Sequence, residues 1–129
     1  MNLLKLVNKK SVIPEKKYKL GIALSGGGTR GFAHLGVLQV LYENNIYPEI
    51  IAGTSSGAIV GALIASGKKP EEAFETMKIR KFTEFSNIKM PDLGLFSLEK
   101  LKKKIQEEIR AKDIKDLSLP FIIALTNLN

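Results

Sequence analysis

The chain has 129 residues, of which 44% are hydrophobic and 7% aromatic, a composition typical of one small globular domain rather than of a disordered chain. It has no cysteine and one histidine, which excludes disulfides and thiolate metal sites and disfavours a conventional zinc site, so we expect no metal and no cofactor. The net charge of +7 favours an anionic partner, phospholipid or nucleic acid. Nucleic acid is disfavoured because no aromatic residues interleave with the basic runs.

The first 17 residues, closed off by Pro14, predict a basic arm or a short amphipathic segment, with the folded domain spanning residues 18–129. Lys5, Lys9 and Lys10 interrupt the apolar stretch that a signal peptide requires. We therefore expect a cytoplasmic protein, with peripheral contact to an anionic membrane as one reading of the lysines. The other reading is that they are solvated and only keep the domain soluble.

Strands and helices alternate along the first half of the domain. Residues 18–25 and 48–53 are short apolar runs typical of buried parallel strands. Apolar residues at three- and four-residue spacing predict a helix over 32–45, which Asn44 and Asn45 terminate. Residues 56–66 predict a helix that is apolar nearly all round, and therefore buried, stopped by Gly67.

The second half of the domain continues this alternation. A helix is predicted from Pro70 to residue 79, followed by an irregular segment over 80–96 that would line a pocket or cover the core. Residues 97–109 predict an amphipathic helix with Ser97 as its N-cap, and 120–128 predict another buried strand. The pattern indicates an α/β fold with a parallel sheet.

The uncharged run from Ile50 to Gly67 has the length of a membrane span. Eight of its eighteen residues are Gly, Ser or Thr, and four of the ten apolar residues are alanine, so membrane insertion would be weak. A strand, a sharp turn and a buried helix explain the same composition. They also explain why Ser55 and Ser56 lie together.

The segment Gly53-Thr54-Ser55-Ser56-Gly57 fits the pattern G-x-S-x-G, with Ser55 at its centre between a predicted strand and a predicted helix. A tight strand-turn-helix lifts the central side chain clear of the backbone, and the helix N-terminus offers backbone N–H groups beside it. Ser55 is therefore a candidate nucleophile, whereas Ser56 belongs to the first helical turn.

An upstream glycine cluster also follows a predicted strand. Gly26, Gly28 and Gly31 satisfy G-x-G-x-x-G, the dinucleotide-binding fingerprint, but the second strand has its acidic residue, Glu49, at its beginning rather than at its end. An oxyanion hole is the better interpretation, because glycine N–H groups converge readily on a developing negative charge.

Two segments together resemble the patatin-like phospholipases, their bacterial branch in particular, in both motifs and in the spacing between them. These segments are "LSGGGTRGFAHLGVLQVL" and "IAGTSSGAIVGAL". The resemblance covers about residues 18–129. It implies a three-layer α/β/α fold with a mainly parallel sheet, here incomplete at the C-terminus. It also implies a serine acyl hydrolase acting on lipid or other ester substrates.

The family's residues carry over to this sequence by motif. Ser55 would be the nucleophile, and Gly26, Gly27 and Gly28 would form the oxyanion hole. Arg30 would add positive charge or brace the loop, unless it is simply a surface arginine. His34 would be structural, because a histidine upstream of the serine does not match the Ser-Asp-His order of α/β-hydrolases.

The family's catalytic partner is an aspartate in an Asp-Gly-Gly or Asp-Gly-Ala motif, and this sequence contains neither. Asp92, Asp113 and Asp116 are the aspartates at hand, and none matches the motif. We therefore expect the aspartate to lie beyond this chain, and the chain alone to be inactive. The alternative is a non-catalytic module that binds lipid or membrane with an idle Ser55.

Overall fold

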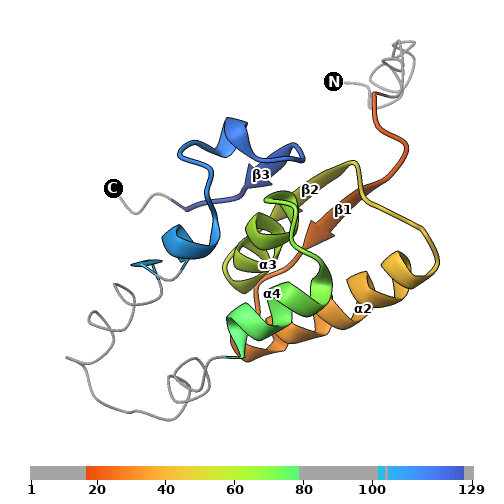
Figure 1. Ribbon diagram of the computed structural model, residues 1–129, viewed down its shortest axis with the longest axis horizontal. Helices are drawn as coiled ribbons and strands as arrows, with labels where there is room; N and C mark the ends of the chain where they lie inside the picture. Colours follow the sequence, from red (N-terminus) through yellow and green to blue (C-terminus); the bar gives the residue numbers. More distant parts are fainter. Residues whose placement is uncertain (1–16, 79–101, 104, 127–129) are drawn as a thin grey trace, which may run out of the picture.

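The computed structural model describes residues 17–78, 102–103 and 105–126. They contain a three-stranded parallel sheet of order β1-β2-β3 (Figure 1). The strands are β1 (Gly21–Leu24), β2 (Ile50–Gly53) and β3 (Phe121–Ile123). The α/β fold with a parallel sheet is therefore confirmed.

The two faces of the sheet differ in what covers them. Ile22, Ile51 and Phe121 stand in register across the three strands, and Ile51 and Phe121 belong to the buried core beneath helix α3 (Ser56–Ala65). On the other face Ile122 is 56% exposed. The described helices thus form one layer, as expected when successive right-handed crossovers join strands that are neighbours in order.

Three α-helices and two 3₁₀ helices have both of their ends within the described residues, and residues 102–103 and 105–108 are also helical. The helices are η1 (Gly28–Gly31), α2 (Phe32–Glu43), α3, α4 (Pro70–Met77) and η2 (Ile114–Asp116). The three predicted α-helices over this part of the chain are confirmed, and α2 ends at Glu43 before the two asparagines. The 3₁₀ helices were not predicted.

Helix α3 forms the centre of the core. Its apolar residues Val60, Leu63 and Ile64 are at most 1% exposed, as expected for a helix that is apolar nearly all round. Ten residues at the usual rise span about 15 Å. Strand β2, a turn and α3 thus account for the uncharged run, and within the described residues no helix is both long and apolar enough to cross a bilayer.

Helices α2 and α4 pack side by side in the lower part of Figure 1. The rings of Phe32 and Phe74 meet edge to face with centroids 5.6 Å apart. Helix α4 begins as predicted at Pro70, where Glu72 accepts a 2.7 Å hydrogen bond from the backbone N–H of Lys69.

Some predicted elements lie partly or wholly outside the described residues. The irregular segment 80–96 lies outside the described residues. Ser97 and the start of the helix that Ser97 was expected to cap also lie outside them. Residues 105–108 are helical, in agreement with the end of that predicted helix. The last predicted strand is shorter than expected, since β3 ends at Ile123 and residues 124–126 are not strand.

The first turn of α3 lies directly against the end of β1. A Cβ added at Gly57 would stand 2.3 Å from the carbonyl oxygen of Leu24 and 2.5 Å from that of Ser25. Both neighbours are backbone atoms that cannot rotate away. Only glycine allows the helix to approach the strand this closely.

We predict that Gly57→Ala lowers the free energy of unfolding by about 3 kcal/mol, because the added methyl group must separate α3 from β1. Gly36→Ala is the matched control, since nothing lies within 4 Å of the position its Cβ would occupy in mid-α2, and alanine favours a helix by about 0.5–1 kcal/mol. Chemical denaturation of both variants checks the opposite signs. A stability loss of equal size in both would contradict the close-approach argument.

Candidate active site

Ser55 lies in the turn between β2 and α3, at the carboxyl edge of the sheet. Its backbone angles are φ 50° and ψ −127°, outside the regions that L-residues favour. Such a conformation costs about 1–3 kcal/mol and persists only where the surroundings impose it. The side chain is exposed, as expected for the central serine of the motif.

The two glycine motifs meet at this turn. A Cβ at Gly26 would stand 3.0 Å from the Ser55 Cβ and 3.7 Å from its Oγ. The loop between β1 and η1 therefore passes directly beside the serine hydroxyl. Glu49, the acid considered for a dinucleotide site, accepts a hydrogen bond from the Lys19 N–H at the opposite end of β2.

Backbone donors are available around Ser55. In the described part of the chain the N–H groups of Gly26 and Gly27 form no backbone hydrogen bond. The same holds for Ser56 and Gly57 in the first turn of α3, where helical N–H groups have no intrahelical partner. These groups and the positive end of the helix dipole favour a negative charge near the serine.

Two contacts brace the turn and the loop. The Thr54 hydroxyl donates to the carbonyl of Ala124 at 3.2 Å, linking the turn to the segment after β3. His34 Nε2 donates to the carbonyl of Ser25 at 2.8 Å, which holds its ring on the glycine loop. In the described residues no side chain forms a hydrogen bond with Ser55 Oγ.

Ser56 lies beneath the loop rather than in the site. Its side chain is 3% exposed, and its Oγ has no hydrogen-bond partner in the described structure. A Cβ at Gly31 would be 2.8 Å from the Ser56 Cβ, so the junction of η1 and α2 rests on this residue. The position agrees with its predicted place in the first helical turn.

Arg30 belongs to η1, the 3₁₀ turn that follows the glycines. Its backbone N–H donates to the Gly27 carbonyl at 3.1 Å, and a Cβ at Gly27 would lie 3.3 Å from the Arg30 Cβ. Gly28 has φ +57°, the left-handed conformation that favours glycine. The three residues thus form one compact turn beside Ser55.

The described aspartates lie far from the serine. Asp113 and Asp116 cap η2: Asp113 accepts from the Lys115 N–H, and Asp116 accepts from the Asp113 N–H. Helix η2 precedes β3, and the strands are parallel, so both carboxylates are at the amino edge of the sheet while Ser55 is at the carboxyl edge. Asp92 lies outside the described residues.

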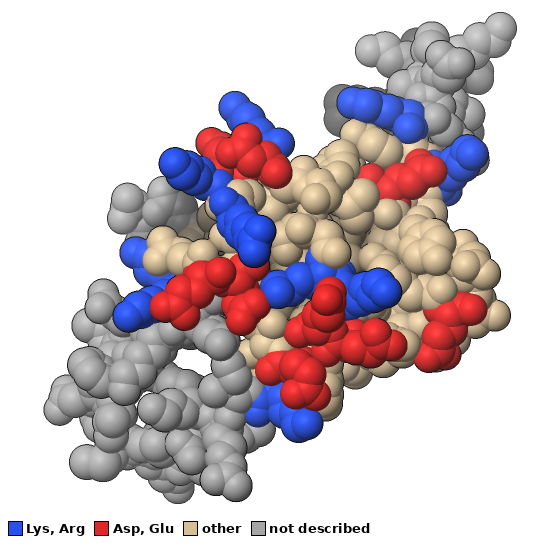
Figure 2. Space-filling view, in the orientation of Figure 1, with Lys and Arg blue, Asp and Glu red and all other residues tan. Residues whose placement is uncertain are grey.

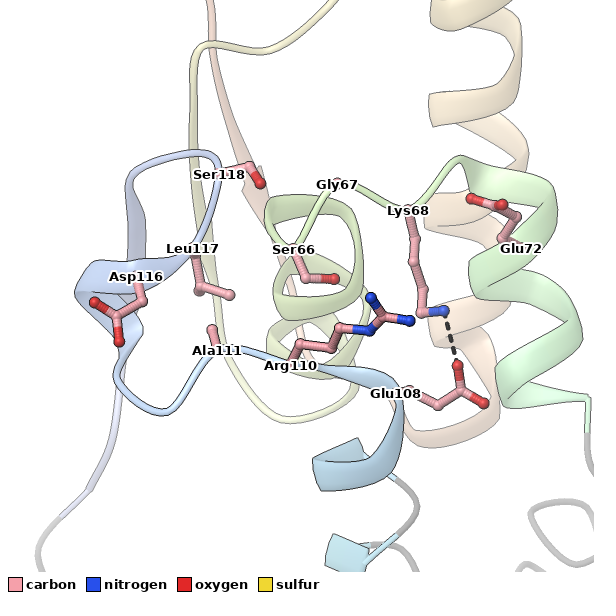
Figure 3. Close-up of a pocket in the computed structure, with 10 residues that line it drawn as sticks. All are labelled: Ser66, Gly67, Lys68, Glu72, Glu108, Arg110, Ala111, Asp116, Leu117 and Ser118. Atoms are coloured by element: carbon pink, nitrogen blue, oxygen red, sulfur yellow. Dashed lines mark ion pairs between the residues drawn. The ribbon is translucent and has the colours of Figure 1, made fainter.

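Figure 3 shows a pocket of about 460 Å³ at that amino edge, where Asp116 is part of the wall. It is formed by the end of α3, the start of α4 and the segment before β3, and its Lys68–Glu108 ion pair measures 2.7 Å. The Arg110 guanidinium points toward Ser66. The length of α3 separates this pocket from Ser55.

Charge is mixed over the described surface. Figure 2 shows acidic and basic side chains interspersed on one face, with acidic groups gathered below its centre.

Burial, and secondly the neighbouring Tyr47, raise the pKa of Tyr42, but this group lies in the last turn of α2, remote from the site. The described site therefore contains an exposed serine hydroxyl and backbone N–H groups.

The sequence matches a family model. Residues 22–128 fit the description "Patatin-like phospholipase". The chain belongs to the patatin-like phospholipase family. The resemblance predicted from the two motifs is therefore confirmed, and the match supports lipid ester hydrolysis at the level of the family.

Curated relatives include proteins from insects and mycobacteria. Neuropathy target esterase sws of Drosophila persimilis is 31% identical over 115 aligned residues, in an alignment that covers 84% of this chain and 8% of that protein. An uncharacterized NTE family protein of Mycobacterium bovis is 30% identical over 112 residues, 85% of this chain and 31% of that protein. The patatin-like chain thus spans less than a third of the length of either relative.

We predict that Ser55→Gly raises the free energy of unfolding by about 1 kcal/mol, because glycine adopts the positive φ without strain. Ala58→Gly, in the first turn of α3, is the matched control and should lower it by about 0.5–1 kcal/mol, since that position is helical. Denaturant titrations of both variants provide the comparison. Similar destabilisation by both would mean that the turn at Ser55 is not strained.

Proposed function

We propose that this patatin-like chain contributes the nucleophile and the oxyanion loop of a serine acyl hydrolase for lipid esters. The observation that supports it is the approach of Gly26 to Ser55, which places the unbonded loop N–H groups beside a strained, exposed serine. Gly27, Gly28 and Arg30 complete the loop. The names of the matched family and relatives favour a phospholipase or esterase over other acyl-transfer enzymes.

The geometry suits attack on an ester carbonyl. Ser55 Oγ would bond to the carbonyl carbon while its proton passes to a base, and the carbonyl oxygen would take up negative charge facing the loop N–H groups. Collapse of this intermediate expels the alcohol, which takes the proton. Water then releases the acid from the acyl-enzyme by the same steps.

The base in this proposal is an aspartate from an Asp-Gly-Gly or Asp-Gly-Ala segment outside these 129 residues. A serine at its free pKa is a weak nucleophile, so activation needs a base within hydrogen-bond reach. Asp113 and Asp116 are engaged in capping η2 at the other edge of the sheet. The lysines near both ends would add peripheral contact with anionic lipid.

We predict that Ser55→Ala abolishes ester hydrolysis in a form of the protein that carries the aspartate segment, because the attacking oxygen is lost. Ser56→Ala should retain most activity, since its hydroxyl is buried and has no partner in the described structure. Hydrolysis of a short activated ester and labelling by a fluorophosphonate probe measure both variants. The chain of 129 residues alone should show no Ser55-dependent turnover.

Three results would contradict this assignment. Equal loss in the two serine variants, with folding intact, would remove the reason to prefer Ser55. Serine-dependent turnover by the chain alone would place the base within it. Lipid binding without any fluorophosphonate labelling would instead support the non-catalytic module.

We predict that Gly28→Val lowers kcat by about 100-fold or more, the usual cost of losing one oxyanion donor. A β-branched residue cannot readily adopt φ +57°, so the loop must shift, whereas KM should change less. Gly28→Asn is the matched control, because asparagine tolerates this conformation. If valine and asparagine changed kcat equally, within a few-fold, the loop would not be the oxyanion hole.

A further inference from the structure

A second cavity, of about 380 Å³, lies between α2 and α4. Its walls are mainly apolar, and its lining includes Phe32, Leu35, Gly36, Pro70 and Phe74. Leu35 is buried beneath it, while Phe74 is 40% exposed at its edge. The cavity is therefore an open apolar groove on the helical layer.

Gly36 has no structural reason to be glycine. It lies inside α2, where glycine weakens a helix relative to alanine, and it does not have a positive φ. Nothing stands within 4 Å of the position a Cβ would occupy, in contrast to the close backbone contact at Gly57. Because Gly36 has no side chain, the middle of the groove stays open.

The aromatic end of the groove lies at the start of α2. Phe32 follows Gly31, which rests on Ser56, and its ring meets that of Phe74. Helix α2 starts at the carboxyl edge of the sheet, where Ser55 lies, and α4 runs back toward the same edge (Figure 1). The aromatic end of the groove is thus the end nearer to the glycine loop.

The polar groups at the rim are already engaged. Gln39 donates to Glu71 at 2.7 Å, and Glu75 pairs with Lys78 at 3.2 Å. Lys78 compensates the charge of Glu75, and the Gln39 amide satisfies Glu71 by a hydrogen bond without changing its charge. The carboxylates along the rim would also repel an anionic group, so the part of a ligand lying in the groove should be uncharged.

We propose that this groove binds the acyl chain of the ester whose carbonyl reacts at Ser55, and this inference rests on the proposed function. The first carbons of the chain lie at Phe32 and its methyl end points toward Gln39. These two residues are seven apart on α2, about 10 Å along its axis. Gly36 lies between them and leaves room for a thin, flexible chain.

The first experiment compares p-nitrophenyl butyrate with p-nitrophenyl palmitate in the form that carries the aspartate segment. Gly36→Leu fills the groove, and the loss in kcat/KM should grow with chain length, by about fourfold for each methylene excluded. The matched control is Val40→Leu, which changes a 57% exposed residue on the same helix outside the groove. Loss independent of chain length, or no loss, would overturn the proposal.

The second experiment needs no catalysis and uses the chain with Ser55→Ala. A sixteen-carbon fatty acid with a nitroxide near its methyl end should broaden the amide NMR signals of Gly36 and Gln39. Gly36→Leu should abolish the broadening and Val40→Leu should preserve it. Broadening without any esterase activity in the first experiment would retain the groove as an acyl site while refuting the proposed function.

Two outcomes of the second experiment would overturn the acyl proposal. One is the absence of broadening in a chain that folds. The other is displacement of these signals by a basic amphipathic peptide and not by the fatty acid, which would make the groove a docking surface for protein. Thermal unfolding of each variant shows that the chain is folded, and Gly36→Leu should raise Tm by a few degrees.

Discussion

The contact between the first turn of α3 and the end of β1 determines the geometry around Ser55. Because Gly57 has no side chain, the helix starts within contact of the carbonyls of Leu24 and Ser25. One residue, Thr54, separates the end of β2 from Ser55, and the abrupt change of direction leaves Ser55 with a positive φ. The same contact brings the glycine loop after β1 beside the serine.

Local sequence patterns predicted this part of the fold well. Strand runs that end in glycine and a helix that is apolar on all sides constrain the chain through steric and burial effects that depend only on near neighbours. The position of Ser55 in the turn followed from the same reasoning, since G-x-S-x-G between a strand and a helix is typical of a tight turn. The family match over residues 22–128 then agreed with the resemblance.

What the sequence did not predict depends on contacts between distant segments. The bond from Thr54 to Ala124 joins residues 70 positions apart, and no periodicity indicates it. The 3₁₀ turn η1 was missed because its sequence, Gly-Thr-Arg-Gly, carries no helical signal, and its last residue, Gly31, rests on Ser56 of α3. The parallel strand order, not the sequence around Asp116, places that carboxylate at the edge opposite Ser55.

Three residues at or near the starts of α2 and α3 depart from what stability alone would favour. Ser55 has a strained backbone, Ser56 has a buried hydroxyl without a partner in the described structure, and Gly36 weakens the helix it belongs to. Asn45 also has a positive φ, but it follows the end of α2, where that conformation is ordinary. Local rules tend to fail where function requires it. The α3 core, with its residues at most 1% exposed, provides the packing that offsets these costs, so the same helix that strains Ser55 also holds it in place.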